Sequence, residues 1–154
     1  MKDSSSGQVV HLVALRAGQR FALPVSCVRE VLPLPELEPV PLAPAELLGS
    51  FQLRGEIVPV VRPDSLLVIE NPEAPPTVLA ILHERDAICA VAFDRVLGVV
   101  SLSPSDLLPH PLSLQRPWMA HLRVDPKHQL ITVLAGTALI GAIIERLRFA
   151  AATA

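Results

Sequence analysis

Short runs of apolar and β-branched residues, separated by turn residues, recur along the whole chain of 154 residues. Such runs predict strands, several of them joined closely enough to form hairpins. We assign strands to residues 9–15, 20–23, 30–32, the second half of 49–61, 77–82, 87–93, 96–102, 121–124 and 129–134. About nine strands spaced in this way predict a mainly β protein with a closed or nearly closed architecture.

The chain is organised around residues 49–61, whose second half is almost continuously apolar. This half predicts a strand buried on both faces, and Pro59, which cannot donate a ladder hydrogen bond, predicts an edge or a bulge. Arg54 needs a partner or an exposed position, because an unpaired buried charge is costly. Gly55 permits a positive φ or a close backbone approach. These features fit a docking edge, and nothing here combines a nucleophile with a base.

Helical signals are few, and 16 prolines argue against an all-helical protein. Residues 44–49 predict one helical turn ended by glycine, after an extended segment, Pro33 to Pro44, with five prolines. That segment could also be a ligand for an SH3-type partner, but it lacks basic specificity residues. Thr137 is a candidate cap for a final helix that continues to about Phe149. The helix is apolar on most faces, so we expect it to pack into the body.

The composition points to surfaces that bind partners. Hydrophobic residues make up 51% of the chain, and the mean hydropathy is +0.47, which is high for a protein without a membrane segment. The longest uncharged run, Gln129 to Ile144, is shorter than the ~20 residues that a spanning helix needs. We therefore expect no membrane insertion, and we expect partner-binding apolar surface instead.

Other classes of function find little support. The net charge of −2, without a basic stripe, argues against nucleic-acid binding. Residues 1–6 lack the apolar core of a signal peptide, so we expect a cytoplasmic location. Cys27 and Cys89 are isolated, which predicts buried free thiols.

No catalytic, cofactor-binding or metal-binding residue is predicted. The five histidines lack ligand spacing, and neither a G-x-S-x-G elbow nor a Gly-rich phosphate loop occurs. We assign Asp94 and Asp106 to structural use, since one ends a strand and the other lies in a turn with a cap signal. A small β-barrel hydrolase or metal enzyme remains as an alternative, and only the presence of scattered His and Asp residues supports it.

Four segments in order carry a resemblance to a known family. They are Phe-Ala-Leu-Pro at 21–24, Val-Arg-Glu-Val-Leu at 28–32, residues 48–61 with Leu-Arg-Gly-Glu-Ile-Val-Pro-Val inside, and Phe-Asp-Arg-Val-Leu-Gly-Val-Val at 93–100. The chain resembles the CheW family of chemotaxis coupling proteins over about residues 9–144. This resemblance implies two small SH3-like β-barrels packed together over a shared core, with a C-terminal helix.

The expected organisation is a single domain at 9–149 between tails at 1–8 and 150–154. Within it we expect the first barrel at about 20–75. We expect the second at about 76–136, together with the N-terminal strand, and the helix at 137–149.

The resemblance also implies a function, that of a non-catalytic adaptor between chemoreceptors and a CheA-type histidine kinase. The regulatory domain of the kinase would dock on an edge of the first barrel. The cytoplasmic tip of a methyl-accepting chemoreceptor would bind the groove between the barrels, and Glu30 and Arg54 would form an ion pair on neighbouring strands. The implied partner-binding residues are Val28, Glu30, Gln52, Leu53, Arg54, Gly55, Ile57 and Val58.

Three positions depart from the family pattern. The family usually has Asn where Gln52 stands, Asp-Leu where Arg62-Pro63 stands, and Asp-Leu where Ala135-Gly136 stands. A diverged adaptor of a twitching-motility or other chemosensory-like pathway is therefore the alternative function.

Overall fold

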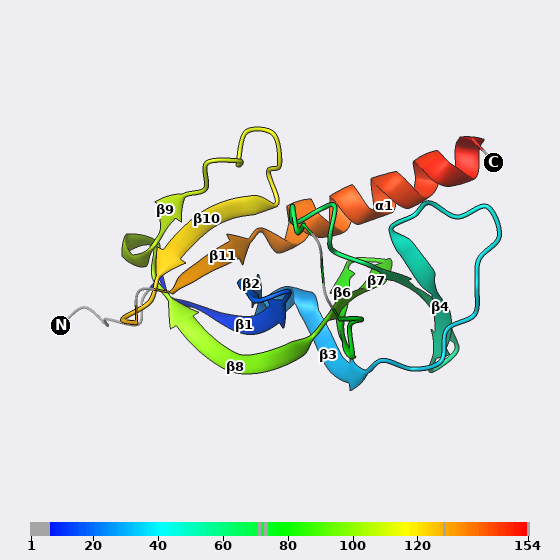
Figure 1. Cartoon of the computed structure of the whole chain (residues 1–154), viewed down its shortest axis with the longest axis horizontal. Coiled ribbons are helices and arrows are strands. Elements are labelled where there is room, and N and C mark those ends of the chain that lie inside the picture. The colour runs from blue at the N-terminus through cyan, green and yellow to red at the C-terminus, as the bar shows by residue number, and fades with distance from the viewer. Residues whose placement is uncertain (1–6, 71, 73, 128, 154) are drawn as a thin grey trace.

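The structure is a computed structural model, which describes residues 7–70, 72, 74–127 and 129–153. In these residues the chain is mainly β, with two sheets and one C-terminal helix (Figure 1). The strands are β1 (Val9–Arg16), β2 (Gln19–Pro24), β3 (Val28–Pro33), β4 (Leu47–Leu53), β5 (Glu56–Val61), β6 (Val78–Glu84), β7 (Ala87–Phe93), β8 (Arg95–Leu102), β9 (Leu108–Pro109), β10 (Met119–Val124) and β11 (Leu130–Leu134). The helical elements are η1 (Val25–Cys27), η2 (Pro104–Asp106) and α1 (Gly136–Thr153).

The middle of the chain forms a five-stranded sheet in the order β3-β6-β7-β5-β4. The ends of the chain form a six-stranded sheet in the order β8-β1-β2-β11-β10-β9. The expected division near residue 76 therefore differs from the observed sheets, because β6 and β7 pair with β3 and β5 and not with the second sheet. Pairing between distant strands decides this grouping, and local sequence patterns do not report it.

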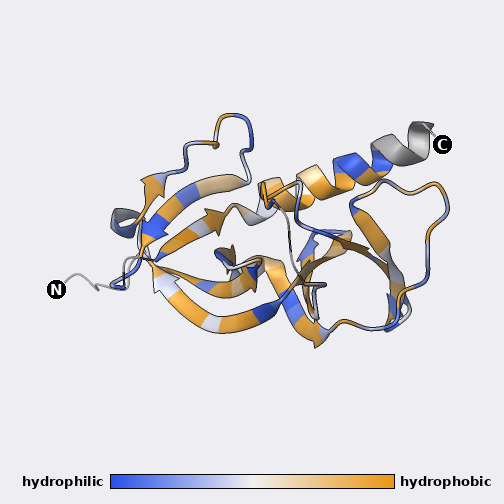
Figure 2. Cartoon of the chain, in the orientation of Figure 1, coloured by the Kyte–Doolittle hydropathy of each residue, from blue (hydrophilic) through white to orange (hydrophobic). Residues whose placement is uncertain are grey.

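The two sheets share one apolar cluster, and each sheet also has a smaller cluster of its own. Phe21 of β2 and Phe93 of β7 are both fully buried, and their ring centroids lie 6.4 Å apart. Leu139 and Ile143 of α1 are buried in the same cluster. Figure 2 shows that the first turns of α1 are strongly apolar, which fits a helix that packs against β6 and β7. The expectation of a packed terminal helix is confirmed.

The start of α1 differs from the expectation. The helix begins at Gly136, and the Thr137 hydroxyl donates to Oε1 of Glu84 at 2.7 Å, so it ties α1 to β6. A Cβ on Gly136 would lie 2.8 Å from Sγ of Cys27, so glycine allows the helix to approach η1 closely. Among the described residues, no helix is both long and apolar enough to cross a membrane.

The expected helical turn at 44–49 is wrong, since β4 begins at Leu47. Gly49 does not end a helix: a Cβ there would lie 2.7 Å from the carbonyl oxygen of Glu38. The proline-rich segment runs antiparallel beside β4 at this point, and Glu38 and Ser50 exchange backbone hydrogen bonds of 2.8 and 2.9 Å. The outer edge of β4 is thus partly covered, which limits pairing with a foreign strand.

Candidate partner-binding surface

A two-residue turn joins β4 to β5 and presents Arg54. Arg54 and Gly55 have φ values of +47° and +86°, and Leu53 pairs with Glu56 across the turn. Two left-handed residues in a two-residue hairpin loop match the right-handed twist of the strands. A Cβ on Gly55 would meet no atom within 4 Å. Its positive φ, and not a close approach, is therefore the reason for glycine here.

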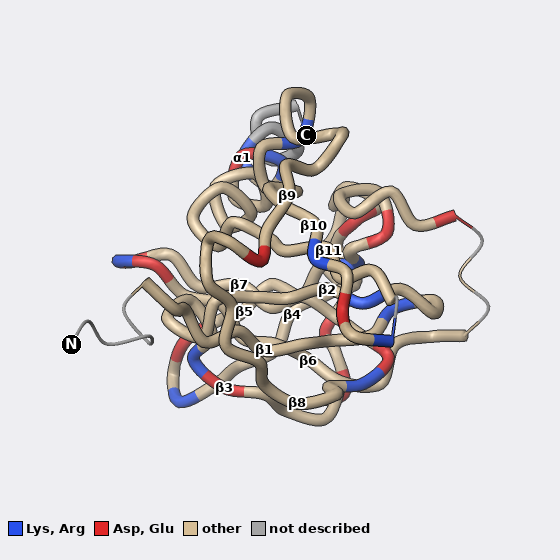
Figure 3. The backbone as a smooth tube through the Cα atoms, turned by 90° about the vertical axis from the view of Figure 1, so that its left-hand side faces the viewer, with Lys and Arg blue, Asp and Glu red and all other residues tan. Residues whose placement is uncertain are grey.

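The Arg54 side chain forms a two-pronged ion pair with Glu30 of β3. Nη1 and Nη2 of Arg54 donate to the two carboxylate oxygens of Glu30 at 2.5 and 3.2 Å. This interaction holds the pKa of the Glu30 carboxyl below its usual range. Beside it, Nη1 of Arg29 donates to Oε1 of Glu56 at 3.0 Å. We call these four residues the charged corner, and Figure 3 shows acidic and basic residues interleaved next to β3.

The charged corner joins elements that are far apart in the sheet order. β3 and β4 are the two end strands of the five-stranded sheet, and Arg54 lies at the tip of the β4–β5 hairpin. The implied Glu30–Arg54 pair is confirmed, but it does not lie between hydrogen-bonded neighbours. It brings one end of the curved sheet to the other, and its two residues remain partly exposed.

The other implied partner-binding residues differ in exposure. Gln52 is exposed and pairs with Ile57 across the hairpin, and the Ile57 side chain is 71% exposed. Val28 and Leu53 are half-buried against the cores. Val58 is fully buried, so its side chain faces no partner and its inclusion in the surface is corrected. Successive side chains of a strand point to opposite faces, and the expectation of a strand buried on both faces therefore fails at Ile57.

An apolar groove of about 340 Å³ lies beside Ile57. We call it the Ile57 groove, and its lining comes from the proline-rich segment, the hairpin and α1. The lining residues are Val40, Pro41, Leu42, Ala43, Pro44, Leu47, Ser50, Ile57, Pro59 and Leu147. Leu42 is 80% exposed, although it is a large apolar residue. Sequence analysis missed this groove, because residues from 40 to 147 meet only in the folded chain.

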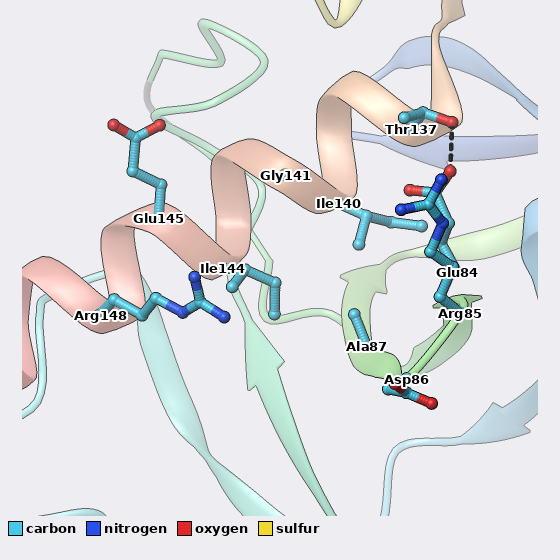
Figure 4. Close-up of a pocket in the computed structure, with 10 residues that line it drawn as sticks. All are labelled: Glu84, Arg85, Asp86, Ala87, Thr137, Ile140, Gly141, Ile144, Glu145 and Arg148. Carbon is cyan, nitrogen blue, oxygen red and sulfur yellow. Dashed lines mark hydrogen bonds between the residues drawn. The ribbon is translucent and has the colours of Figure 1, made fainter.

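A second groove, of about 690 Å³, lies between α1 and the β6–β7 hairpin (Figure 4). Ile140 and Ile144 point from the helix toward the hairpin, and Glu145 points away from it (Figure 4). Arg85 and Asp86 line the hairpin side. The groove has an apolar floor and charged residues of both signs at its rim. None of its lining residues is a Cys, His or Ser.

The reactive side chains have structural surroundings. Burial raises the pKa of the Cys27 thiol to about 11 and that of Cys89 to about 12, and the expectation of buried free thiols is confirmed. His11 is buried, and its Nδ1 lies 2.9 Å from the carbonyl oxygen of Val9. Asp106 accepts from the Ser103 backbone N–H in a capping box. Within the described residues, no group of three or more Cys, His, Asp or Glu side chains could hold a metal ion.

Two β-sheets joined by a shared apolar cluster, with exposed apolar and ion-paired surface, define a small β domain of the two-barrel type. The chain belongs to the CheW-like domain family, which matches residues 11–143.

The similar proteins agree with this assignment. The chain is 31% identical over 104 residues to chemotaxis protein CheW of Rhizobium meliloti (strain 1021), with 65% of this chain and 66% of the relative covered. It is 34% identical over 96 residues to protein FrzA of Myxococcus xanthus, with 60% and 59% covered. The match spans a little less than two thirds of the length of each relative.

The crystal structure of the scaffolding protein TtCheW from Thermoanaerobacter tengcongensis superposes with a TM-score of 0.72 at 18% identity, covering 82% of this chain and 84% of that one. The fold, two SH3-like barrels with a C-terminal helix, is therefore confirmed.

Proposed function

We propose that this protein is a non-catalytic adaptor that couples chemoreceptors to a CheA-type histidine kinase in the cytoplasm. The family match and the similarity to chemotaxis protein CheW support this proposal. The observation that carries it is that the β4–β5 hairpin takes part in two surfaces of different chemistry, the charged corner and the Ile57 groove. An adaptor needs two such surfaces, one for each partner.

The Ile57 groove is the surface that we assign to the regulatory domain of the kinase. It is apolar, and the exposed side chains of Ile57 and Leu42 can bury apolar area when a partner binds. Glu38 already pairs with Ser50 on the outer edge of β4, so contacts between side chains are more available there than added strand pairing.

The charged corner, with Val28 and Gly55, is the surface that we assign to the cytoplasmic tip of a chemoreceptor. Val31, which follows Glu30 along β3, is 37% exposed, so the strand that carries Arg29 and Glu30 also offers apolar surface. Charged side chains that are held in place by ion pairs suit recognition of a partner. Charge complementarity across an interface contributes more to specificity than to affinity.

A second pathway is supported by one specific observation. The similarity to protein FrzA of Myxococcus xanthus, whose name does not refer to chemotaxis, favours an adaptor of another chemosensory-like pathway, such as one for twitching motility. The same two surfaces would serve that role with a different kinase and receptor.

Titration calorimetry tests the proposal directly. The purified chain is titrated with the regulatory domain of a CheA-type kinase, and separately with a soluble receptor fragment that carries the cytoplasmic tip. We expect saturable binding of each partner, and simultaneous binding when both are present. Absence of binding to every CheA-type regulatory domain of the same organism would overturn the kinase assignment.

A further inference from the structure

One guanidinium group is buried where the two sheets meet. Arg16 ends β1 of the six-stranded sheet, and its side chain is only 2% exposed. Arginine keeps its charge in proteins, so a group in this position requires compensating partners.

The partners of Arg16 come from segments connected to the five-stranded sheet. Nε and Nη2 donate to the two carboxylate oxygens of Asp64 at 2.9 and 3.1 Å. Nη1 donates to Oδ1 of Asp94 at 2.7 Å and to the carbonyl oxygen of Ala74 at 2.8 Å. Asp64 and Ala74 lie in the connection from β5 to β6, and Asp94 lies between β7 and β8, where the chain passes from one sheet to the other.

Asp94 is itself held on both sides. Its Oδ2 accepts from the backbone N–H of Ala17 at 2.9 Å, and its own N–H donates to the carbonyl oxygen of Leu15 at 2.8 Å. The Thr77 hydroxyl donates to the carbonyl oxygen of Asp94 at 2.6 Å. Asp94 is thus held by hydrogen bonds that do not involve Arg16, so the guanidinium meets a carboxylate whose position is fixed.

The shared core alone does not fix the angle between the sheets to the same degree. Apolar packing is non-directional, whereas a planar guanidinium with four hydrogen bonds constrains both distance and orientation. Buried ion pairs add little net stability, and their best-attested use is to specify one arrangement among several.

We propose that Arg16, Asp64 and Asp94 form an inter-barrel latch that sets the relative orientation of the two barrels. Through this orientation, Arg16 acts as a positioning residue for any partner that contacts both barrels. The second statement rests on the proposed function, together with the implication of the family resemblance that the receptor tip binds in the groove between the barrels.

Residual dipolar couplings of backbone amides test the latch without any partner. In the wild type we expect the couplings of both sheets to fit one alignment tensor with the orientation of the structure. In Arg16→Met, which keeps most of the side-chain volume, we expect each sheet to retain its own fit while their relative orientation changes or averages. Arg29→Met is the matched control, because it removes an equal charge from an exposed ion pair within one barrel.

An unchanged relative orientation in Arg16→Met would overturn the latch, whatever the melting temperature does. If Arg16→Met does not fold, Arg16→Lys and Asp64→Asn are measured in the same way and decided by the same criterion. Lysine keeps the charge but lacks the planar fork, so Arg16→Lys should reproduce the change in part.

Binding then tests the positioning role. If about one Arg16→Met molecule in ten has the competent orientation, receptor-tip binding weakens about tenfold, while kinase-domain binding at the Ile57 groove stays near the wild-type value. Equal weakening of both partners would show a general loss of structure and overturn the positioning role. If the wild type binds neither the receptor tip nor the kinase domain, the proposed function is refuted. The latch is then tested by the dipolar couplings alone.

Discussion

Glu30 and Arg54 lie 24 positions apart in the chain, and their side chains meet through two hydrogen bonds where β3 approaches the β4–β5 hairpin. The carboxylate comes from an end strand, and the guanidinium comes from a hairpin turn where arginine adopts a left-handed backbone. Only glycine, asparagine and aspartate adopt that backbone readily. The turn therefore holds a residue that this backbone disfavours, and it places the arginine side chain against Glu30.

We expect Arg54→Asn to remove the charge of Arg54 without destabilising the fold. Asparagine tolerates the left-handed backbone, so the melting temperature should stay close to that of the wild type. Receptor-tip binding should weaken, because the charged corner loses its fixed cation. Arg54→Glu, which sets two carboxylates against each other, should weaken it further. Calorimetry against the receptor fragment measures both variants, and wild-type affinity in Arg54→Glu would contradict the assignment of this surface.

Ile57 and Val58 provide a matched pair on one strand. Ile57→Asp should leave stability within about 0.5 kcal/mol, as is usual for exposed positions, and it should abolish binding of the kinase regulatory domain. Val58→Ala should cost roughly 2–3 kcal/mol, from lost burial and a small cavity, and it should leave the affinity of the folded protein unchanged. Chemical denaturation and calorimetry measure the two effects. Loss of stability in Ile57→Asp without loss of binding would reverse the assignments.

Local signals were sufficient for the hairpins but not for their assembly. The β6–β7 and β10–β11 hairpins follow from apolar runs that flank short polar turns, and the structure has both. The sheet that each hairpin joins depends on partners such as β3, which pairs with β6 about 50 residues later in the chain. Gly49 was misread for a related reason, since the atom that requires glycine there is the carbonyl oxygen of Glu38.

The site residues show the same limit. The resemblance to a family supplied the Glu30–Arg54 pair, and no periodicity could have done so. The latch was missed because a charged residue after an apolar strand is typical of a solvent-exposed turn, and Arg16 lies between the expected strands at 9–15 and 20–23. Its carboxylate partners stand 48 and 78 positions away. Val58 was assigned to the surface with Ile57, although strict alternation along the strand could have separated them.

Stability should depend on pH through His11. Burial lowers the pKa of this histidine below its usual value near 6.5, so the unfolded chain binds more protons than the folded chain in the window between the two pKa values. Stability is therefore constant with respect to His11 above about pH 6.5, and it falls as the pH drops below that value. His110, whose pKa burial also lowers, acts in the same direction.

His11→Asn should reduce this pH dependence, because asparagine keeps a donor for the Val9 carbonyl and does not titrate. Urea denaturation at about pH 7.5 and about pH 5.5, on either side of the usual histidine pKa, measures the change. The variant should lose less free energy of unfolding than the wild type over this interval, with a residual loss from His110. An equal loss in the two proteins would contradict the assigned burial of His11.

Gly136 and Cys27 should show energetic coupling. Alanine normally stabilises a helix relative to glycine by about 1 kcal/mol in the interior and by less at the first turn. At this position, however, the new Cβ would lie 2.8 Å from Sγ and 3.0 Å from Cβ of Cys27. Overpacking of a dense core costs roughly 1–3 kcal/mol, so it should outweigh the gain in helix propensity, and Gly136→Ala should be less stable than the wild type.

Cys27→Ala removes Sγ, the nearer of the two clashing atoms, and leaves a small space beneath the helix. The double variant Cys27→Ala with Gly136→Ala should therefore be more stable than the sum of the single changes predicts, by about 0.5–1 kcal/mol or more. Gly18→Ala is a control for substitution of a glycine without a steric neighbour, since a Cβ there would meet no atom within 4 Å and only its positive φ opposes alanine. It should show no coupling with Cys27→Ala. If the changes in the free energy of unfolding for the Gly136 and Cys27 variants are additive in a double-mutant cycle, the start of the helix can shift away from η1. Close packing at this point would then not be what holds α1 on the barrels.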